Sequence, residues 1–191
     1  MTLIFATGNK GKLIEAQEIL GEGYEILSTA SVGIEGEAEE TGDTFEENSR
    51  LKARYVHERC HRDCFADDSG VVVDALNGAP GVYTARYAGP DCNFDDNINK
   101  LLHELEGVPF EQRTARFVCV VTLIKDGVET QYRGKVEGKI AFERSGKGGF
   151  GYDPVFIPDE FPDKTMAELE EDVKNSISHR FHALDLMRKA L

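Results

Sequence analysis

The sequence lacks any long hydrophobic run, and this absence excludes a membrane-spanning chain. The longest apolar stretch, residues 117–124, is far shorter than the roughly 20 residues that a spanning helix needs. At the N-terminus, the apolar run of residues 3–6 is too short for the core of a signal peptide and has no basic flank. We therefore expect a cytoplasmic protein with no membrane partner.

Positive charge is also scarce. The chain carries 22 Lys and Arg against 35 Asp and Glu, a formal net charge of −13. Nucleic-acid binding needs a basic footprint for the phosphate backbone, so this balance argues against nucleic acid as the main partner. A small polyanion is still a suitable ligand. Salt screens charges that are more than about 8 Å apart. The binding of a small polyanion therefore depends on a local group of lysines with a divalent ion, and less on the net charge of the chain.

Cysteine is infrequent, with four residues at positions 60, 64, 92 and 119. Cys60-His61-x-x-Cys64 resembles half of a zinc site, but no second pair follows at ligand spacing. Unpaired thiols in a reducing compartment are the preferred interpretation. With 191 residues, the chain can bury about 70% of its unfolded surface without a disulfide or metal.

Strand and helix patterns alternate along the chain, which predicts an α/β fold within one domain, residues 1–191. Thr44 has capping-box spacing to Glu47 and predicts a helix to about residue 59, while Asp126-Gly127 predicts a hairpin turn. Strands are expected at residues 2–7, 24–28, 65–73, 115–124, 130–136 and 155–157. Further helices are expected after the glycine turn at residues 8–12, at 93–105, and from a cap at Ser178 to 190.

Asp67-Asp68 is the first candidate for chemistry. Two adjacent carboxylates in a strand cannot both point into an apolar core. One of them either caps a turn or serves a site, where it would hold Mg²⁺ or take a proton from water. Glu39 and Glu40, in the acidic loop 31–42, offer a further carboxylate ligand. The alternative for them is a solvated charge run.

Residues 146–154 read G-K-G-G-F-G-Y-D-P and form the second candidate. Glycines there let the backbone approach a ligand, and an aromatic ring between them is suited to stacking on a planar base. The alternative is a turn whose rings complete the core.

Lysines at 12, 52 and 174 are the third candidate, although each alone is typical of a protein surface. Arg180 opposes the dipole at a helix N-terminus, which indicates a specific partner.

Six motifs in this order resemble the inosine triphosphate pyrophosphatase family, the XTP/dITP diphosphatases. They are A-T-G-N-K-G-K from residue 6, E-T-G-x-T-F-x-E-N from 40, A-D-D-S-G from 66, G-A-P-G-V-Y-T-A-R from 78, G-G-F-G-Y-D-P from 148 and S-H-R from 178. The similarity runs from residue 2 to the C-terminus. Tyr152 stands where eukaryotic members carry tryptophan, so the resemblance is to a bacterial or archaeal type. Phe181 replaces a usual glycine.

The resemblance implies an elongated α/β domain with a long mixed sheet, two lobes and a central substrate cleft. It also implies a homodimer that uses Mg²⁺ to hydrolyse non-standard purine nucleoside triphosphates, namely ITP, dITP and XTP. The products would be the monophosphate and pyrophosphate, so that these nucleotides leave the nucleotide pool. A pyrophosphatase for another modified or pyrimidine nucleotide, and a non-catalytic nucleotide sensor, remain alternatives.

Residue roles also follow from the resemblance. Asp68 would accept the proton and bind metal, with Glu40 as the second metal ligand. The triphosphate would be held by Thr7, Gly8, Asn9, Lys10, Gly11, Lys12, Lys52 and Ser69. The base and sugar would be held by Phe150, Gly151, Tyr152, Asp153, Lys174, His179 and Arg180. Phe150 would stack on the base, and Arg180, His179 or backbone groups would pair with its 6-oxo group.

Overall fold

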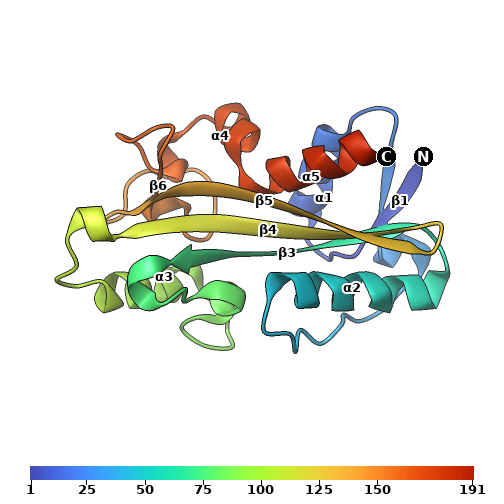
Figure 1. Cartoon of the computed structure of the whole chain (residues 1–191), viewed down its shortest axis with the longest axis horizontal. Helices are drawn as coiled ribbons and strands as arrows, with labels where there is room; N and C mark the ends of the chain where they lie inside the picture. The colour runs from blue at the N-terminus through green and yellow to red at the C-terminus, as the bar shows by residue number, and fades with distance from the viewer. The chain divides into compact units, whose positions relative to one another are not determined.

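Six strands form one mixed sheet in the computed structural model, which describes all residues, 1–191. The strand order is β2-β1-β3-β4-β5-β6, with β1 parallel to both β2 and β3, and β6 antiparallel to β5. The strands are β1 Thr2–Phe5, β2 Glu25–Ser28, β3 Cys64–Val73, β4 Thr114–Lys125, β5 Val128–Ile140 and β6 Phe156–Pro158. The helices are α1 Lys10–Leu20, α2 Phe45–Cys60, α3 Phe94–Glu104, α4 Glu171–Ile177 and α5 His179–Ala190. The predicted α/β class with a mixed sheet is confirmed (Figure 1).

The chain divides into two compact units, each built from separated segments. The first unit comprises Met1–Asp68, Cys119–Gly134 and Arg180–Leu191, and the second comprises Ser69–Val118 and Lys135–His179. Each unit is described by itself below. The central cleft implied by the family resemblance stays a prediction.

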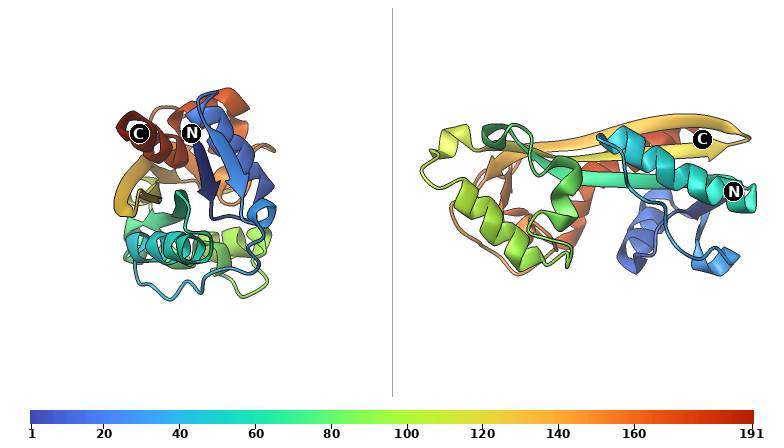
Figure 2. Two further views of the ribbon diagram at one scale, coloured as in Figure 1. Left: turned by 90° about the vertical axis from the view of Figure 1, so that its right-hand side faces the viewer. Right: turned by 90° about the horizontal axis from the view of Figure 1, so that it is seen from below.

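The first unit has helices on both faces of its strands. Leu3, Phe5 and Phe65 share one face with α1 and α5, and the Phe5 and Phe65 rings stack with centroids 4.4 Å apart. Ile4 and Ala66 lie on the other face and pack against α2. Alternate residues of a strand point to opposite faces, so the two runs Leu3–Phe5 and Cys64–Ala66 supply both cores. The left view of Figure 2 shows α2 on one side of these strands and α1 and α5 on the other.

The second unit has one core cluster. Ile98 and Leu101 bring α3 onto this core, and the rings of Phe117 and Phe156 lie 4.4 Å apart within it.

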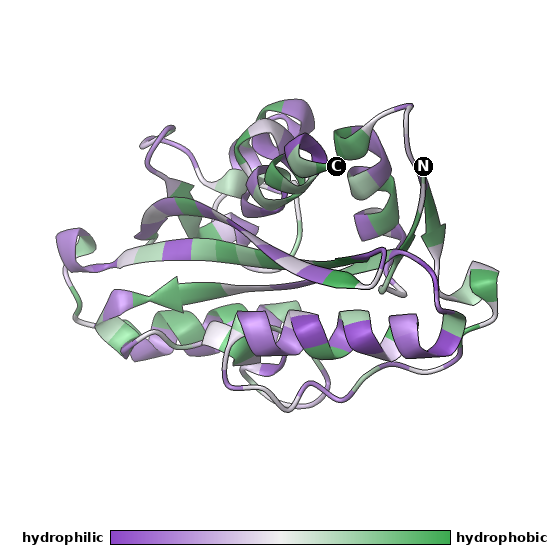
Figure 3. Cartoon of the chain, turned by 45° about the vertical axis from the view of Figure 1, so that its right-hand side comes forward, coloured by the Kyte–Doolittle hydropathy of each residue, from purple (hydrophilic) through white to green (hydrophobic).

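No helix of the structure combines the length and hydropathy that a membrane crossing requires. In Figure 3, hydrophilic residues predominate on the face of α2 that is turned to the viewer.

Several local predictions are confirmed. Thr44 caps α2 by accepting the Glu47 N–H at 3.1 Å, and the helix expected at residues 93–105 is α3, Phe94–Glu104, which Asn93 caps. The β4–β5 hairpin turns at Asp126 and Gly127, both with positive φ, which glycine adopts at little cost. Helix α4 was not expected from the sequence, because its seven residues are mostly polar and show no apolar period.

Candidate active site

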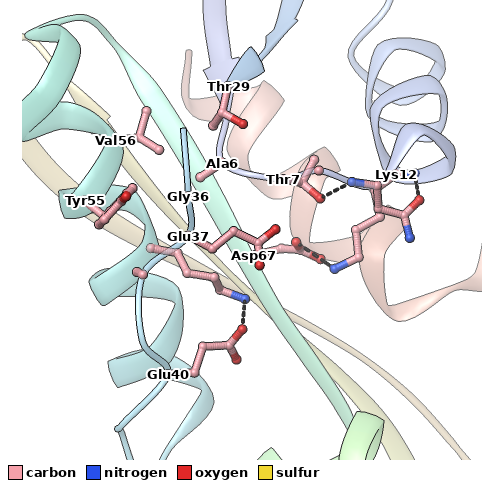
Figure 4. Close-up of a pocket in the computed structure, with 14 residues that line it drawn as sticks. Ala6, Thr7, Lys12, Thr29, Gly36, Glu37, Glu40, Tyr55, Val56 and Asp67 are labelled. Carbon is pink, nitrogen blue, oxygen red and sulfur yellow. Dashed lines mark hydrogen bonds and ion pairs between the residues drawn. The ribbon is translucent and has the colours of Figure 1, made fainter. Parts of the chain in front are cut away.

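A pocket of about 240 Å³ lies in the first unit, where the chain leaves β1. Thr7, Gly8 and Asn9 line it directly after the strand, and Lys12 lines it from the first turn of α1. The Asn9 side chain caps α1 by accepting the N–H groups of Gly11 and Lys12 at 2.8 and 3.2 Å. The strand, turn and helix start predicted to surround an anion site therefore do border a pocket (Figure 4).

The end of β1 explains why β3 contributes a carboxylate to this pocket. Strand β1 pairs with β3 only at Ile4 and Phe5, and the last backbone bond runs from the Ala6 N–H to the Phe65 carbonyl at 2.8 Å. Beyond that bond, β3 continues without β1 beside it. Residues 67 and 68 of β3 follow at once, and Asp67 lines the pocket.

Asp67 is 2% exposed and is surrounded by cations. Lys12 Nζ donates to both of its oxygens at 3.1 Å, and Arg180 Nε donates to Oδ2 at 3.2 Å. Burial alone would raise the pKa of Asp67, but the charges of Lys12, Arg180 and Lys52 outweigh it and hold the pKa well below the usual range. Asp67 is therefore a permanently ionised anchor for these cations.

Asp68 has a different environment, although it is the next residue. It is 7% exposed, its Oδ1 accepts from Lys52 Nζ at 3.3 Å, and its buried Oδ2 has no hydrogen-bond partner. Burial, with the charge of Glu40, raises the pKa of Asp68 to about 6 against the opposing charge of Lys52. An unpartnered carboxylate oxygen with such a pKa is suited to accept a proton from water at neutral pH.

Lys52 connects the two carboxylates that the resemblance assigns to metal. Its Nζ lies 3.5 Å from Glu40 Oε1 and 3.3 Å from Asp68 Oδ1. Burial lowers the pKa of Lys52, but Asp67, Asp68 and Glu40 together raise it above its usual value, so it stays charged. Figure 4 shows Glu40 and Asp67 at the same pocket, with the Glu40–Lys52 ion pair as a dashed line.

The donor set fits Mg²⁺ only when substrate takes part. No group of three or more His, Cys, Asp or Glu side chains is placed to hold a metal. Glu40 and Asp68 are two carboxylates that share one ammonium, and Asp68 Oδ2 is an unused acceptor. Mg²⁺ commonly binds through one or two carboxylates, waters and substrate phosphates, which this arrangement allows.

The glycine-rich loop belongs to the second unit and has a fixed internal geometry. Asp153 Oδ2 accepts the Phe150 N–H at 3.0 Å and lies 2.7 Å from Lys174 Nζ, so Asp153 and Lys174 are brought together. Gly149 has φ of 70°, and a Cβ there would overlap with Asp153 Oδ2. Glycine is therefore required at 149. The Phe150 ring is 56% exposed, with Lys174 Nζ 4.9 Å from its centroid.

Other predicted site residues have internal partners. Tyr152 is 3% exposed and donates to the Thr84 carbonyl at 2.7 Å. The His179 ring stacks on Phe117 with centroids 5.1 Å apart, and Ser69 also belongs to the second unit. Arg180 belongs to the first unit, where it is 4% exposed and bonded to Asp67 and Glu15.

Sequence reasoning did not single out Thr29, Glu37 and Tyr55, which also line the pocket. Thr29 follows β2, Glu37 lies in the acidic loop and Tyr55 lies in α2. Of these segments, only the acidic loop was indicated by the sequence as a candidate site. Two residues that it did mention, Lys10 and Glu39, are exposed and do not line the pocket.

A family model matches residues 3–190 of this chain, and it is that of the Ham1 family. The chain belongs to the Ham1 family. The resemblance drawn from the six motifs is confirmed, because relatives of this chain are named dITP/XTP pyrophosphatase. One of them, from Bacillus subtilis strain 168, is 51% identical over 190 residues, covering 98% of this chain and 96% of the relative.

Two further similarities cover nearly the whole chain. The dITP/XTP pyrophosphatase of Halalkalibacterium halodurans is 47% identical over 191 residues, which is 98% of this chain and 97% of the relative. The structure of the Staphylococcus aureus Ham1 protein is similar with a TM-score of 0.92 and 38% identity, covering 100% of this chain and 97% of that one. Sequence and fold therefore agree on the family.

Proposed function

We propose that this protein hydrolyses the non-standard purine nucleoside triphosphates dITP, XTP and ITP to the monophosphate and pyrophosphate. The relatives named dITP/XTP pyrophosphatase, at 47–51% identity over nearly the full chain, support this substrate class. We further propose that residues 1–191 act as one catalytic domain, as a homodimer in the cytoplasm.

The observation that carries the proposal is the different state of two adjacent carboxylates of β3: Asp67 lines the pocket, and Asp68 is bonded to Lys52, which lines it. Asp67 is paired with two cations, while Asp68 keeps a buried oxygen without a partner. A pure nucleotide binder gains little from a carboxylate oxygen without a partner beside phosphates, since the charges repel. A hydrolase gains a proton acceptor.

The lysines of the first unit suit the phosphate end of the substrate. Lys12 lines the pocket at the start of α1 and Lys52 lines it from α2. Both ammonium groups would neutralise charge on the triphosphate and on the leaving pyrophosphate, which is the main catalytic term in phosphoryl-type displacements. The backbone around Thr7–Asn9 would contact phosphate oxygens at the helix N-terminus, and Ser69 is proposed as a further phosphate ligand.

Glu40 and Asp68 would hold Mg²⁺. When bound, the ion supplies positive charge that offsets the negative charge developing on the leaving group. Asp68 Oδ2 would accept the proton of the attacking water, and Lys52 would keep Oδ1 in place through its 3.3 Å contact. The water oxygen would form a bond to the α-phosphorus as the bond to the pyrophosphate oxygen breaks.

The loop of residues 150–153 in the second unit is proposed to bind the base. The exposed Phe150 ring has the surface needed for stacking, and Asp153 fixes the loop backbone beneath it through the Phe150 N–H. Stacking of a base on an aromatic ring is worth about 1–3 kcal/mol. The buried Tyr152 would support this loop from the core of its own unit.

The test is pyrophosphate release from a panel of triphosphates: dITP, XTP, ITP, GTP, ATP and dTTP, each with and without Mg²⁺. The proposal predicts turnover of the first three, Mg²⁺ dependence, and much slower turnover of ATP and dTTP. Preference for dTTP would support a pyrimidine pyrophosphatase instead. Binding without pyrophosphate release from any of the six would support a nucleotide sensor.

A further inference from the structure

Glu15 lies outside every site predicted from the sequence, yet it is joined to the pocket through a continuous set of ion pairs. Its Oε2 accepts from Arg180 Nη1 at 2.6 Å, and its side chain is only 16% exposed. Arg180 Nε in turn donates to Asp67, which accepts Lys12 Nζ at both oxygens. Four charged side chains are thus linked in order: Glu15 of α1, Arg180 at the start of α5, Asp67 of β3, and Lys12 of α1 at the pocket.

The charges of this set balance, two carboxylates against two cations. Balance is required because Asp67 and Arg180 are almost fully buried, and a buried charge that loses its partner is strongly unfavourable. Arg180 divides its donors, Nη1 to Glu15 and Nε to Asp67. Asp67 can therefore accept hydrogen bonds from Lys12 and Arg180 at the same time.

Loss of Glu15 would change how the two oxygens of Asp67 are divided between Arg180 and Lys12. The planar guanidinium is suited to bind both oxygens of one carboxylate through two parallel hydrogen bonds. Without Glu15, Arg180 would turn both donors to Asp67 and compete with the Lys12 ammonium for the same oxygens. Lys12, which is held on the pocket side by Asp67 alone, would lose its fixed position.

We propose that Glu15 is a positioning residue: by holding one side of Arg180, it leaves Asp67 free to fix the Lys12 ammonium at the phosphate end of the pocket. This inference rests on the proposed function, in which Lys12 contacts phosphate. Glu15 itself touches no substrate in this scheme.

The test compares Glu15→Ala and Glu15→Gln with Glu18→Ala, which removes the same charge from an exposed position on the same helix. The probe is inorganic pyrophosphate with Mg²⁺, titrated by calorimetry. We expect Glu15→Ala to weaken pyrophosphate binding about 10-fold, the scale of one hydrogen bond to a charged group. Glu15→Gln, which keeps an acceptor oxygen for Arg180, should weaken it less, and Glu18→Ala should leave it unchanged. Equal dissociation constants for Glu15→Ala and Glu18→Ala would overturn the inference.

A double-mutant cycle separates positioning from a general loss of structure. If Glu15 acts through Lys12, Glu15→Ala adds little to the loss already caused by Lys12→Ala. An equal loss in both backgrounds would mean that Glu15 acts elsewhere, and the inference would be wrong. In turnover, Glu15→Ala should raise KM and also lower kcat, because Lys12 is proposed to neutralise charge on the bound triphosphate and on the leaving pyrophosphate. Absence of turnover by the wild-type protein with all substrates would refute the proposed function, while pyrophosphate binding would still test Glu15. No binding of pyrophosphate by the wild-type protein would overturn the inference itself.

Discussion

Asp67 and Asp68 are consecutive in β3 and yet are held by lysines of different helices, Asp67 by Lys12 of α1 and Asp68 by Lys52 of α2. Successive side chains of a strand point to opposite faces, and α1 and α2 cover opposite faces of this part of the sheet. The sheet therefore separates an ionised anchor from a carboxylate that keeps an unpartnered oxygen.

The first prediction concerns stability. Asp67→Asn should lower the free energy of unfolding by about 3–5 kcal/mol, because it leaves buried cations without their carboxylate. Asp68→Asn should leave stability unchanged or raise it. The pKa of Asp68 is raised, mainly by burial, to about 6, so its charged form at pH 7 costs folding energy that a neutral amide avoids. Urea unfolding with EDTA present measures both, and equal losses would contradict the account.

The second prediction concerns metal. Chelation should abolish pyrophosphate release, and added Mg²⁺ should restore it. Glu40→Gln should raise the Mg²⁺ concentration needed for half-maximal turnover, because one of two carboxylate ligands is lost. Glu39→Gln is the matched control, since Glu39 is its exposed neighbour and does not line the pocket. The same shift in both variants would argue against Glu40 as a ligand.

The third prediction concerns the base. Phe150→Ala should raise KM for dITP and XTP about 10-fold, as expected from the loss of one stacked ring. The melting temperature should change little because the ring is largely exposed. Phe142→Ala removes an equally exposed ring from the same unit and serves as the control. An unchanged KM for Phe150→Ala would remove the stacking role.

Local features of this fold follow from the sequence because they depend on neighbouring residues. The Thr44 cap, the Asn93 cap and the Asp126-Gly127 turn each satisfy or bend backbone within a few positions. The Asp67-Asp68 pair was recognisable in the same way as unsuited to an apolar core. Which of the two is an anchor, however, depends on Lys12 and Arg180, which are far away in sequence.

The links from Glu15 to Arg180 and from Arg180 to Asp67 were not predictable for that reason. They span 165 and 113 positions, and no periodicity or motif records such contacts. Arg180 gave one local signal, a cation at the start of a helix, where the dipole disfavours it. The structure supplies two carboxylate partners that offset that cost.

The most direct test of the account is the turnover of Asp68→Asn at saturating Mg²⁺ and dITP, with Asp163→Asn, an exposed aspartate, as the control. Amide nitrogen and oxygen cannot take the proton of the attacking water, so kcat should fall by about 100-fold or more, while Asp163→Asn keeps wild-type turnover. A folded Asp68→Asn variant with undiminished pyrophosphate release would contradict the assignment of Asp68 as the proton acceptor.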